Sequence, residues 1–239
     1  MLSDSLQVPN HIGLIMDGNR RWAKQKGLAT FEGHLEGYET LKEITKAAID
    51  RGVRYVSAYA FSTENWNRTE KEVKYLMGMA YRMMTRDIKD LDKENIRVVW
   101  LGSSEKVSSK LLKAIKKAEE TTKDNTRGTL AICFNYGAQQ EIVDAARKLI
   151  EANTTAEDVT KETFEAALYA PEVPQIDLLI RTSGEQRLSN FMLWRVAYAE
   201  LHFISKHWPD FSTKDLDEAL AVYQKRERRL GGNTSSTAA

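Results

Sequence analysis

Short apolar runs alternate with longer helical patterns along most of this chain, and this alternation limits its fold more than any other feature. The runs are continuously apolar, which is typical of strands buried on both faces of a sheet. The expected strands are 13–16, 55–60, 97–101, 130–135 and 178–181. The expected helices are 33–51, 69–93, 104–122, 138–152, 160–169 and 212–229. This order predicts βαβ units and an α/β fold, with a mostly parallel central sheet covered by helices on both faces.

Two of the expected helices begin with capping signals. Thr69 and Glu72 have the spacing of a capping box, in which the hydroxyl and the carboxylate each satisfy a free backbone N–H. Ser212 and Asp215 form a weaker version of the same pattern. Both pairs therefore predict helix starts.

Length and composition describe one ordinary globular domain. The chain has 239 residues and shows no internal repeat or linker, so we expect one domain over 1–232 and a disordered tail over 233–239. The net charge of +1 gives no broad basic surface and predicts no nucleic-acid partner. Cys133 is alone, which excludes an internal disulfide and suits a reducing compartment. No signal-like start or long apolar span is present, and a cytoplasmic location is expected.

The end of the first expected strand carries the strongest chemical signal. Asp17, Gly18 and Asn19 lead from the strand into a probable helix start that contains Arg20 and Arg21. A glycine lets the backbone approach a ligand closely, and a helix start offers free N–H groups to an anion. A carboxylate beside arginines is explained if Asp17 holds Mg²⁺, which would bridge to phosphate oxygens. The stretch predicts a site for a metal-bound diphosphate, although an ordinary turn would use the same residue types.

Polar loops follow three other expected strands. These loops are 61–68, 135–137 and 181–190, and the first and last contain arginine. Ligands of parallel α/β sheets bind outside the carboxyl ends of the strands, so the loops should converge at one edge. Several basic loops at one edge indicate a polyanionic substrate.

The last of these loops resembles a second phosphate site. Arg181 and Arg187 can each bind a phosphate through two N–H groups, and the Ser189 hydroxyl adds a donor. Gly184 would allow close approach of the backbone. A solvated surface loop remains the alternative.

Several further side chains have both a functional and a structural interpretation. Glu200 lies in a semi-apolar stretch and is either a second Mg²⁺ ligand with Asp17 or an ion-pair partner of Arg195 or another arginine. His34, at a probable helix start, could donate to a phosphate. Arg229 could contact an anion or could simply complement the dipole of the last helix.

Aromatic and methionine side chains are equally ambiguous. Trp66, flanked by Asn65, could stack on a ligand or fill the edge of the core. The expected helix 69–93 carries Leu76 and a methionine-rich stripe. Such a stripe is usually core, but it would also suit the wall of a tunnel for a flexible hydrocarbon.

Together these motifs resemble the cis-prenyltransferase family, which includes the undecaprenyl diphosphate synthases. The matching pieces, in order, are residues 11–19, 21–23, 33–34, 59–68, 135–137, 180–191 and 226–229. They span the chain from about Pro9 to Gly232. Such separated motifs in the right order cover nearly the whole sequence.

The resemblance implies a homodimeric enzyme that adds isopentenyl diphosphate to an allylic diphosphate with cis stereochemistry and uses Mg²⁺. Asp17 and Glu200 would bind the metal, with Glu200 acting across the dimer interface, and Asn65 would assist proton removal. Arg229 would complete the site of the partner subunit. The growing chain would occupy an apolar tunnel.

The resemblance also assigns the two diphosphates. The allylic diphosphate would lie over Gly18, Asn19, Arg20, Arg21 and His34. Isopentenyl diphosphate would be held by Arg181, Arg187 and Ser189. The other expected substrate-binding residues are Met16, Trp22, Phe61, Ser62, Glu64, Trp66 and Arg68.

Two positions depart from the family pattern. Arg20 stands where the family usually has glycine, and Thr30 stands where it often has arginine. We hypothesise that Arg20 replaces the missing charge on the allylic diphosphate.

The length of the product is open in the sequence. Ala60 is small where a bulky residue tends to shorten the product, which favours a medium- or long-chain lipid carrier. The resemblance implies farnesyl or geranyl diphosphate as the allylic primer. Phe134 and Trp100 are bulky and could narrow the tunnel, so a short-chain synthase is the alternative. A non-catalytic partner subunit is a further alternative, and a hydrophobic product suggests peripheral membrane contact.

Overall fold

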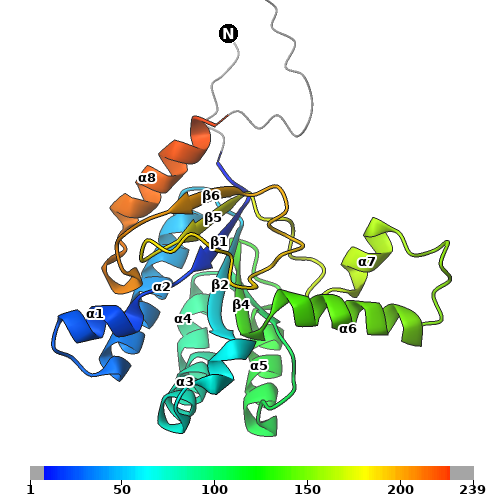
Figure 1. Ribbon diagram of the computed structural model, residues 1–239, viewed down its shortest axis with the longest axis horizontal. Coiled ribbons are helices and arrows are strands. Elements are labelled where there is room, and N and C mark those ends of the chain that lie inside the picture. Colours follow the sequence, from blue (N-terminus) through cyan, green and yellow to red (C-terminus); the bar gives the residue numbers. More distant parts are fainter. Residues whose placement is uncertain (1–7, 227–239) are drawn as a thin grey trace, which may run out of the picture.

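The computed structural model describes residues 8–226, which form a six-stranded parallel sheet in the order β3-β4-β2-β1-β5-β6 (Figure 1). The strands are β1 (His11–Ile15), β2 (Tyr55–Ser62), β3 (Ile96–Leu101), β4 (Gly128–Tyr136), β5 (Leu178–Arg181) and β6 (Glu200–Phe203). The predicted α/β fold with a parallel sheet is confirmed. Strand β1 pairs with β2 on one side and with β5 on the other, so the strand order changes direction between β1 and β5, which is where such sheets bind ligands.

The helices follow the predicted alternation with shifted ends. They are α1 (Asn19–Gln25), α2 (Thr30–Asp50), α3 (Glu70–Arg82), α4 (Ile88–Lys93), α5 (Ser109–Thr122), α6 (Ala138–Glu151), α7 (Lys161–Ala167) and α8 (Thr213–Gln224). Short 3-10 turns η1 (Thr63–Asn67) and η3 (Trp208–Asp210) precede α3 and α8. The predicted helix 69–93 is divided by a π-helical turn, η2 (Met83–Asp87). The final residues of predicted helix 212–229 lie outside the described part of the chain.

Strand β6 was missed by the sequence analysis. Its four residues are all half-buried, and they include Glu200 and His202. They therefore lack the continuous apolar run that marks strands buried on both faces. The strand forms because it pairs with β5 at the edge of the sheet, and this tertiary contact has no signal in the local sequence.

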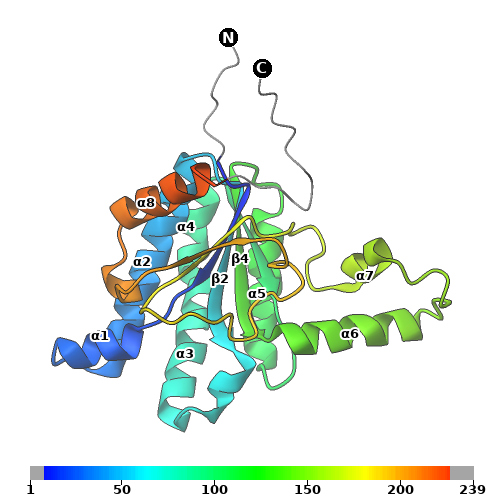
Figure 2. The same cartoon turned by 45° about the horizontal axis from the view of Figure 1, so that its top comes forward.

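The two faces of the sheet are covered differently. Helices α2, α3, α5 and α8 pack on one face, where their apolar side chains form the larger core cluster (Figures 1 and 2). Within this chain, the other face is covered mainly by the connection between β5 and β6, through Phe191, Met192 and Val196. Helices α6 and α7 extend away from the body in both views. No helix within residues 8–226 has the length and apolar character needed to cross a bilayer.

The two predicted capping boxes have different outcomes. Ser212 forms a full box with Asp215, whose carboxylate accepts from the Ser212 amide at 2.8 Å. At α3, the Thr69 hydroxyl accepts from the Glu72 amide at 3.4 Å. The Glu72 carboxylate, however, contacts His34 and Arg68 of the neighbouring pocket, so only half of the predicted box forms.

Candidate active site

The loop after β1 forms one wall of a polar pocket, and Gly18 fixes its course. Gly18 has φ of 110°, in the left-handed region that side chains disfavour. A Cβ added there would also collide with the Ser183 hydroxyl and lie 2.7 Å from Nδ1 of His207. Glycine is thus required by both the backbone conformation and the space available.

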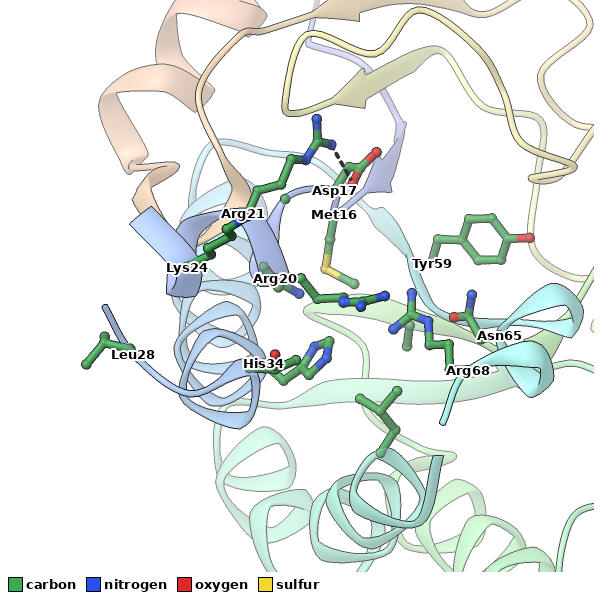
Figure 3. Close-up of a pocket in the computed structure, with 15 residues that line it drawn as sticks. Met16, Asp17, Arg20, Arg21, Lys24, Leu28, His34, Tyr59, Asn65 and Arg68 are labelled. Atoms are coloured by element: carbon green, nitrogen blue, oxygen red, sulfur yellow. Dashed lines mark hydrogen bonds and ion pairs between the residues drawn. The ribbon is translucent and has the colours of Figure 1, made fainter. Parts of the chain in front are cut away.

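The pocket has a volume of about 810 Å³ and lies at the carboxyl ends of the strands. It is lined by Met16, Asp17, Gly18, Asn19, Arg20, Arg21, Lys24, Leu28, Thr30, His34, Tyr59, Ala60, Asn65, Arg68 and Leu76. Arg20 of α1 and Arg68 beyond η1 reach toward each other across it (Figure 3). With Arg21 and Lys24, they give the pocket a strongly cationic lining, which suits a polyanion.

Asp17 joins the loops after β1 and β5. Its carboxylate accepts from Arg21 Nη2 at 3.0 Å and from Arg181 Nη2 at 2.9 Å. Partial burial alone would raise the pKa of Asp17, but hydrogen bonds from Arg181 and Arg21 outweigh it and hold that pKa below its usual value. The carboxylate is therefore ionised at neutral pH.

The three residues of the predicted second phosphate site lie together around Arg181. Arg181 Nη1 donates to Ser189 Oγ at 2.8 Å and to the carbonyl of Arg187. Its Nε is buried and has no hydrogen-bond partner among residues 8–226, which leaves a donor for an anion. The Arg187 side chain is exposed and pairs with Glu185 at 2.5 Å.

Glu72 is a residue of this site that the sequence analysis did not select. Its buried carboxylate lies 3.1 Å from His34 Nε2 and 2.9 Å from Arg68 Nη1. Arg20 Nη1 lies 4.0 Å away. Burial, aided by the charges of Arg68 and Arg20, holds the pKa of His34 below 6.5 against the opposing effect of Glu72. His34 is then neutral at pH 7, and its Nε2–H donates to Glu72.

Some predicted substrate-binding residues serve the scaffold around the pocket. Trp22 Nε1 donates to Asp210 at 2.8 Å, and Trp66 Nε1 donates to Asn135 at 2.7 Å. Phe61 is buried between Trp66 and Phe134. Trp66 therefore has the core-edge contacts that were its structural alternative. Glu64 accepts from Asn190.

Asn65 does line the pocket. Its Oδ1 accepts from the Ser62 amide at 3.2 Å, so the turn that follows β2 holds the side chain. Lys24, Leu28 and Tyr59 also line the pocket without having been selected. Lys24 could have been found, because it lies four residues after Arg20 on the same helix.

Glu200 lies at the opposite end of the sheet from Asp17. It begins β6 and aligns with Leu178 at the start of β5, whereas Arg181 ends β5 beside Asp17. Glu200 pairs with Arg226 and not with Arg195, which binds Glu141 at 2.8 Å. Within one chain, Glu200 and Asp17 are therefore too far apart to share an ion.

The predicted substrate-binding residue Arg229 lies outside the described residues.

An apolar chamber opens from the polar pocket. It has a volume of about 90 Å³ and shares Met16, Asn19, His34, Ala60 and Leu76 with the pocket. Its other lining residues are Gly37, Tyr38, Leu41, Met79, Ala80, Met83, Met84, Ile115, Ile132, Phe134 and Trp208. The methionine-rich stripe thus lines a cavity, and Phe134 reaches it. Trp100 instead donates through Nε1 to the Phe134 carbonyl at 2.8 Å.

Comparison with known proteins agrees with this geometry. Residues 15–231 match the profile of a family described as "Putative undecaprenyl diphosphate synthase". This chain belongs to the undecaprenyl diphosphate synthase family. It is a prenyltransferase, as the resemblance predicted.

Individual relatives cover nearly the whole chain. An isoprenyl transferase of Thermotoga maritima is 46% identical, covering 95% of this chain and 98% of the relative. A ditrans,polycis-undecaprenyl-diphosphate synthase ((2E,6E)-farnesyl-diphosphate specific) of Micrococcus luteus is 42% identical, covering 96% and 94%. The crystal structure of lavandulyl diphosphate synthase from Lavandula x intermedia, in complex with dimethylallyl diphosphate, has a TM-score of 0.89 and 36% identity, covering 94% and 98%.

The pocket suits a magnesium ion that is held by few protein ligands and completes its coordination with water and substrate phosphates. Within residues 8–226, no group of three or more His, Cys, Asp or Glu side chains could hold a metal by itself. Mg²⁺ typically takes one or two carboxylates and completes its shell with water and substrate phosphates. Asp17, ionised at the wall of a cationic pocket, fits that arrangement.

Proposed function

We propose that this prenyltransferase condenses isopentenyl diphosphate with an allylic diphosphate and forms a Z double bond. One observation carries the proposal: a cationic pocket opens directly into an apolar chamber through shared wall residues. A substrate with a diphosphate head and a hydrocarbon tail needs these two environments side by side. A phosphatase or sugar-nucleotide enzyme would need only the first.

Each diphosphate has its own set of donors in this proposal. The allylic diphosphate binds along Gly18, Asn19, Arg20 and Arg21, with its tail in the chamber. Isopentenyl diphosphate binds Arg181, Arg187 and Ser189. The unpartnered Nε of Arg181 supports this second assignment.

The reaction forms one carbon–carbon bond, releases diphosphate from the allylic substrate and removes a proton from the isopentenyl group. Asp17 would hold a magnesium ion, and that ion would supply positive charge to stabilise the departing diphosphate. Arg20 and Arg21 add hydrogen bonds to the same charge. Asn65, held by the Ser62 amide, orients the isopentenyl group for loss of its proton.

One relative is named for (2E,6E)-farnesyl diphosphate and another was solved with dimethylallyl diphosphate, so the primer of this protein must be measured. Purified protein would be incubated with Mg²⁺, radiolabelled isopentenyl diphosphate and, separately, dimethylallyl, geranyl or farnesyl diphosphate. We expect incorporation that stops when Mg²⁺ is removed and falls at least roughly 100-fold in the variant Asp17→Asn. A folded protein that incorporates label with none of these primers would contradict the proposal and would favour the partner-subunit alternative.

We also propose that the protein works as a homodimer. The separation of Glu200 from Asp17 within one chain supports this, because a shared metal then needs Glu200 of the partner subunit. Exposed Val143 and Ile150 on the projecting helix α6 offer apolar surface for association.

Peripheral membrane contact would follow from a hydrophobic product and is tested by sedimentation with vesicles that carry polyprenyl diphosphate.

A further inference from the structure

The apolar chamber is small compared with the products of the family. Its volume is about 90 Å³. A cavity of roughly 150 Å³ in another protein accommodates the six carbons of benzene. In this conformation the chamber thus accommodates about one five-carbon unit, and every further unit must displace part of the lining.

The lining residues of β4 show where the chamber ends. Side chains of a strand alternate between faces, so Phe134, Ile132 and Leu130 point to the same side, each deeper than the last. Phe134 and Ile132 line the chamber. Leu130 is fully buried in the packed core below and does not line it. The chamber therefore stops at the level of Ile132.

Met83 and Met84 line the chamber together with Ile115 of α5. They lie about two helical turns after Leu76, which borders both the polar pocket and the chamber, and this spacing puts them toward the end of the chamber that is away from the pocket. They are adjacent in sequence, yet both are buried and both line the chamber. A regular α-helix turns about 100° per residue and directs neighbouring side chains to different sides. Both methionines lie at the start of the π-helical turn η2, a wider turn that often occurs at functional sites.

The π-helical turn is held in place by polar contacts. Tyr38 Oη donates to Asp87 Oδ2 at 2.8 Å, and Arg82 Nε lies 3.5 Å from the same carboxylate. Thr85 Oγ1 donates to the Tyr81 carbonyl at 2.7 Å. These contacts tie η2 to α2 and α3, so it forms a fixed support, while the methionine side chains it carries can change rotamer.

We propose that Met83 and Met84, presented by the π-helical turn, form the floor of the prenyl chamber and set the length of the product. This inference rests on the proposed function and deepens it. Elongation ends when the chain end meets the two methionines and the packed core behind them. The geometry favours a short-chain product over the medium- or long-chain carrier expected from Ala60.

Product analysis tests the floor directly. Wild type, Met83→Ala, Met84→Ala and the double variant would be given radiolabelled isopentenyl diphosphate, and the dephosphorylated products sized by chromatography. We expect the longest product of the double variant to exceed that of wild type by at least one five-carbon unit. Met77→Ala is the matched control, because Met77 is a partly buried methionine of the same helical segment that does not line the chamber. An unchanged product distribution in folded, active double variant would overturn the proposal.

A binding measurement separates this inference from the proposed reaction. Non-reactive thiodiphosphates of geranyl, farnesyl and geranylgeranyl alcohols would be titrated calorimetrically into wild type and variants. We expect wild-type affinity to fall with chain length, and the double variant to bind the longest analogue roughly tenfold tighter than wild type does. Met77→Ala should behave as wild type. If all three analogues bound wild type and double variant alike, the floor would be excluded even in a protein that incorporates no label.

Discussion

Two carboxylates determine which cations of the pocket are free to move onto an anion. Asp17 engages Arg21 and Arg181, and Glu72 engages Arg68 and His34 at hydrogen-bond distance. The Arg20 side chain is 62% exposed and lies 4.0 Å from Glu72. Arg20 is the guanidinium that can swing toward a bound diphosphate at least cost.

Replacement of Arg20 should weaken binding of the allylic substrate selectively. Hydrogen bonds to charged groups contribute about 1.5–3 kcal/mol, so Arg20→Gly should raise the KM for the allylic diphosphate roughly tenfold or more. The KM for isopentenyl diphosphate serves as the internal control and should change little. Arg20→Ala controls for the added backbone freedom of glycine in α1. An unchanged allylic KM in both variants would refute the charge-replacement hypothesis.

His11 should make the protein less stable in mild acid. The Pro174 carbonyl accepts from its Nδ1–H, leaving Nε2 to accept from Ser57 Oγ at 2.8 Å. Burial lowers the pKa of His11 to about 4 from 6.5. The unfolded chain therefore binds a proton between pH 6.5 and 4 that the folded chain does not, and stability falls as pH drops through this window. The loss is ~3 kcal/mol at 1.36 kcal/mol per pKa unit.

Chemical denaturation at pH 7, 5.5 and 4 measures this loss. His11→Asn keeps a donor near Pro174 but cannot titrate. Its free energy of unfolding should depend less on pH than that of wild type across the same window. Parallel pH profiles for the two proteins would show that another group is responsible.

Among the helices, a capping box gives the largest stabilisation where both of its hydrogen bonds form. Ser212 and Asp215 complete a box at α8, and Lys206 pairs with Asp215 at 2.7 Å. At α3 the Glu72 carboxylate is instead directed into the active site. The same sequence pattern therefore stabilises a helix in one place and orders cationic side chains in the other.

Ser212→Ala should destabilise the protein by about 1 kcal/mol, because the Ser212 hydroxyl both accepts from the Asp215 amide and donates to its carboxylate. The midpoint of thermal unfolding should fall by roughly 2–4 °C for a domain of this size. Initial rates with saturating substrates should stay near wild type at 25 °C, since α8 is remote from the pocket lining. An unchanged unfolding midpoint would mean that water replaces the cap.

At the scale of the whole molecule, the parallel sheet separates two carboxylates that the resemblance assigns to one metal. Asp17 follows the carboxyl end of β1, and Glu200 begins β6 at the other end. Parallel pairing through β5 keeps these ends apart in any single chain. A shared site then requires two chains, each supplying one carboxylate to the other.

Mixed dimers test this arrangement. Asp17→Asn and Glu200→Gln should each be nearly inactive alone. A mixed dimer has one site that carries both substitutions and one site that carries neither, so mixing after subunit exchange should restore activity. Affinity tags on the two variants would verify the exchange. Mixed dimers as inactive as their parents would contradict a site shared between Asp17 of one chain and Glu200 of the other.

The α/β class, the main helices and strands, and the clustering of Asp17, Arg20, Arg21 and Arg181 at strand ends could all be predicted from the sequence alone. Apolar runs and the polar residues directly after them are local signals that do not depend on what packs nearby. The methionine-rich stripe is also a local signal, although the sequence left open whether it packs in the core or lines a tunnel.

The tertiary structure alone decided how those pieces combine. It recruited β6 to the sheet edge, directed Glu72 into the pocket, placed Trp66 against Asn135 and separated Glu200 from Asp17. It also introduced the π-helical turn that brings Met83 and Met84 into the chamber. Each outcome depends on burial and pairing between residues far apart in the chain, and those energies have no signature in the neighbouring sequence.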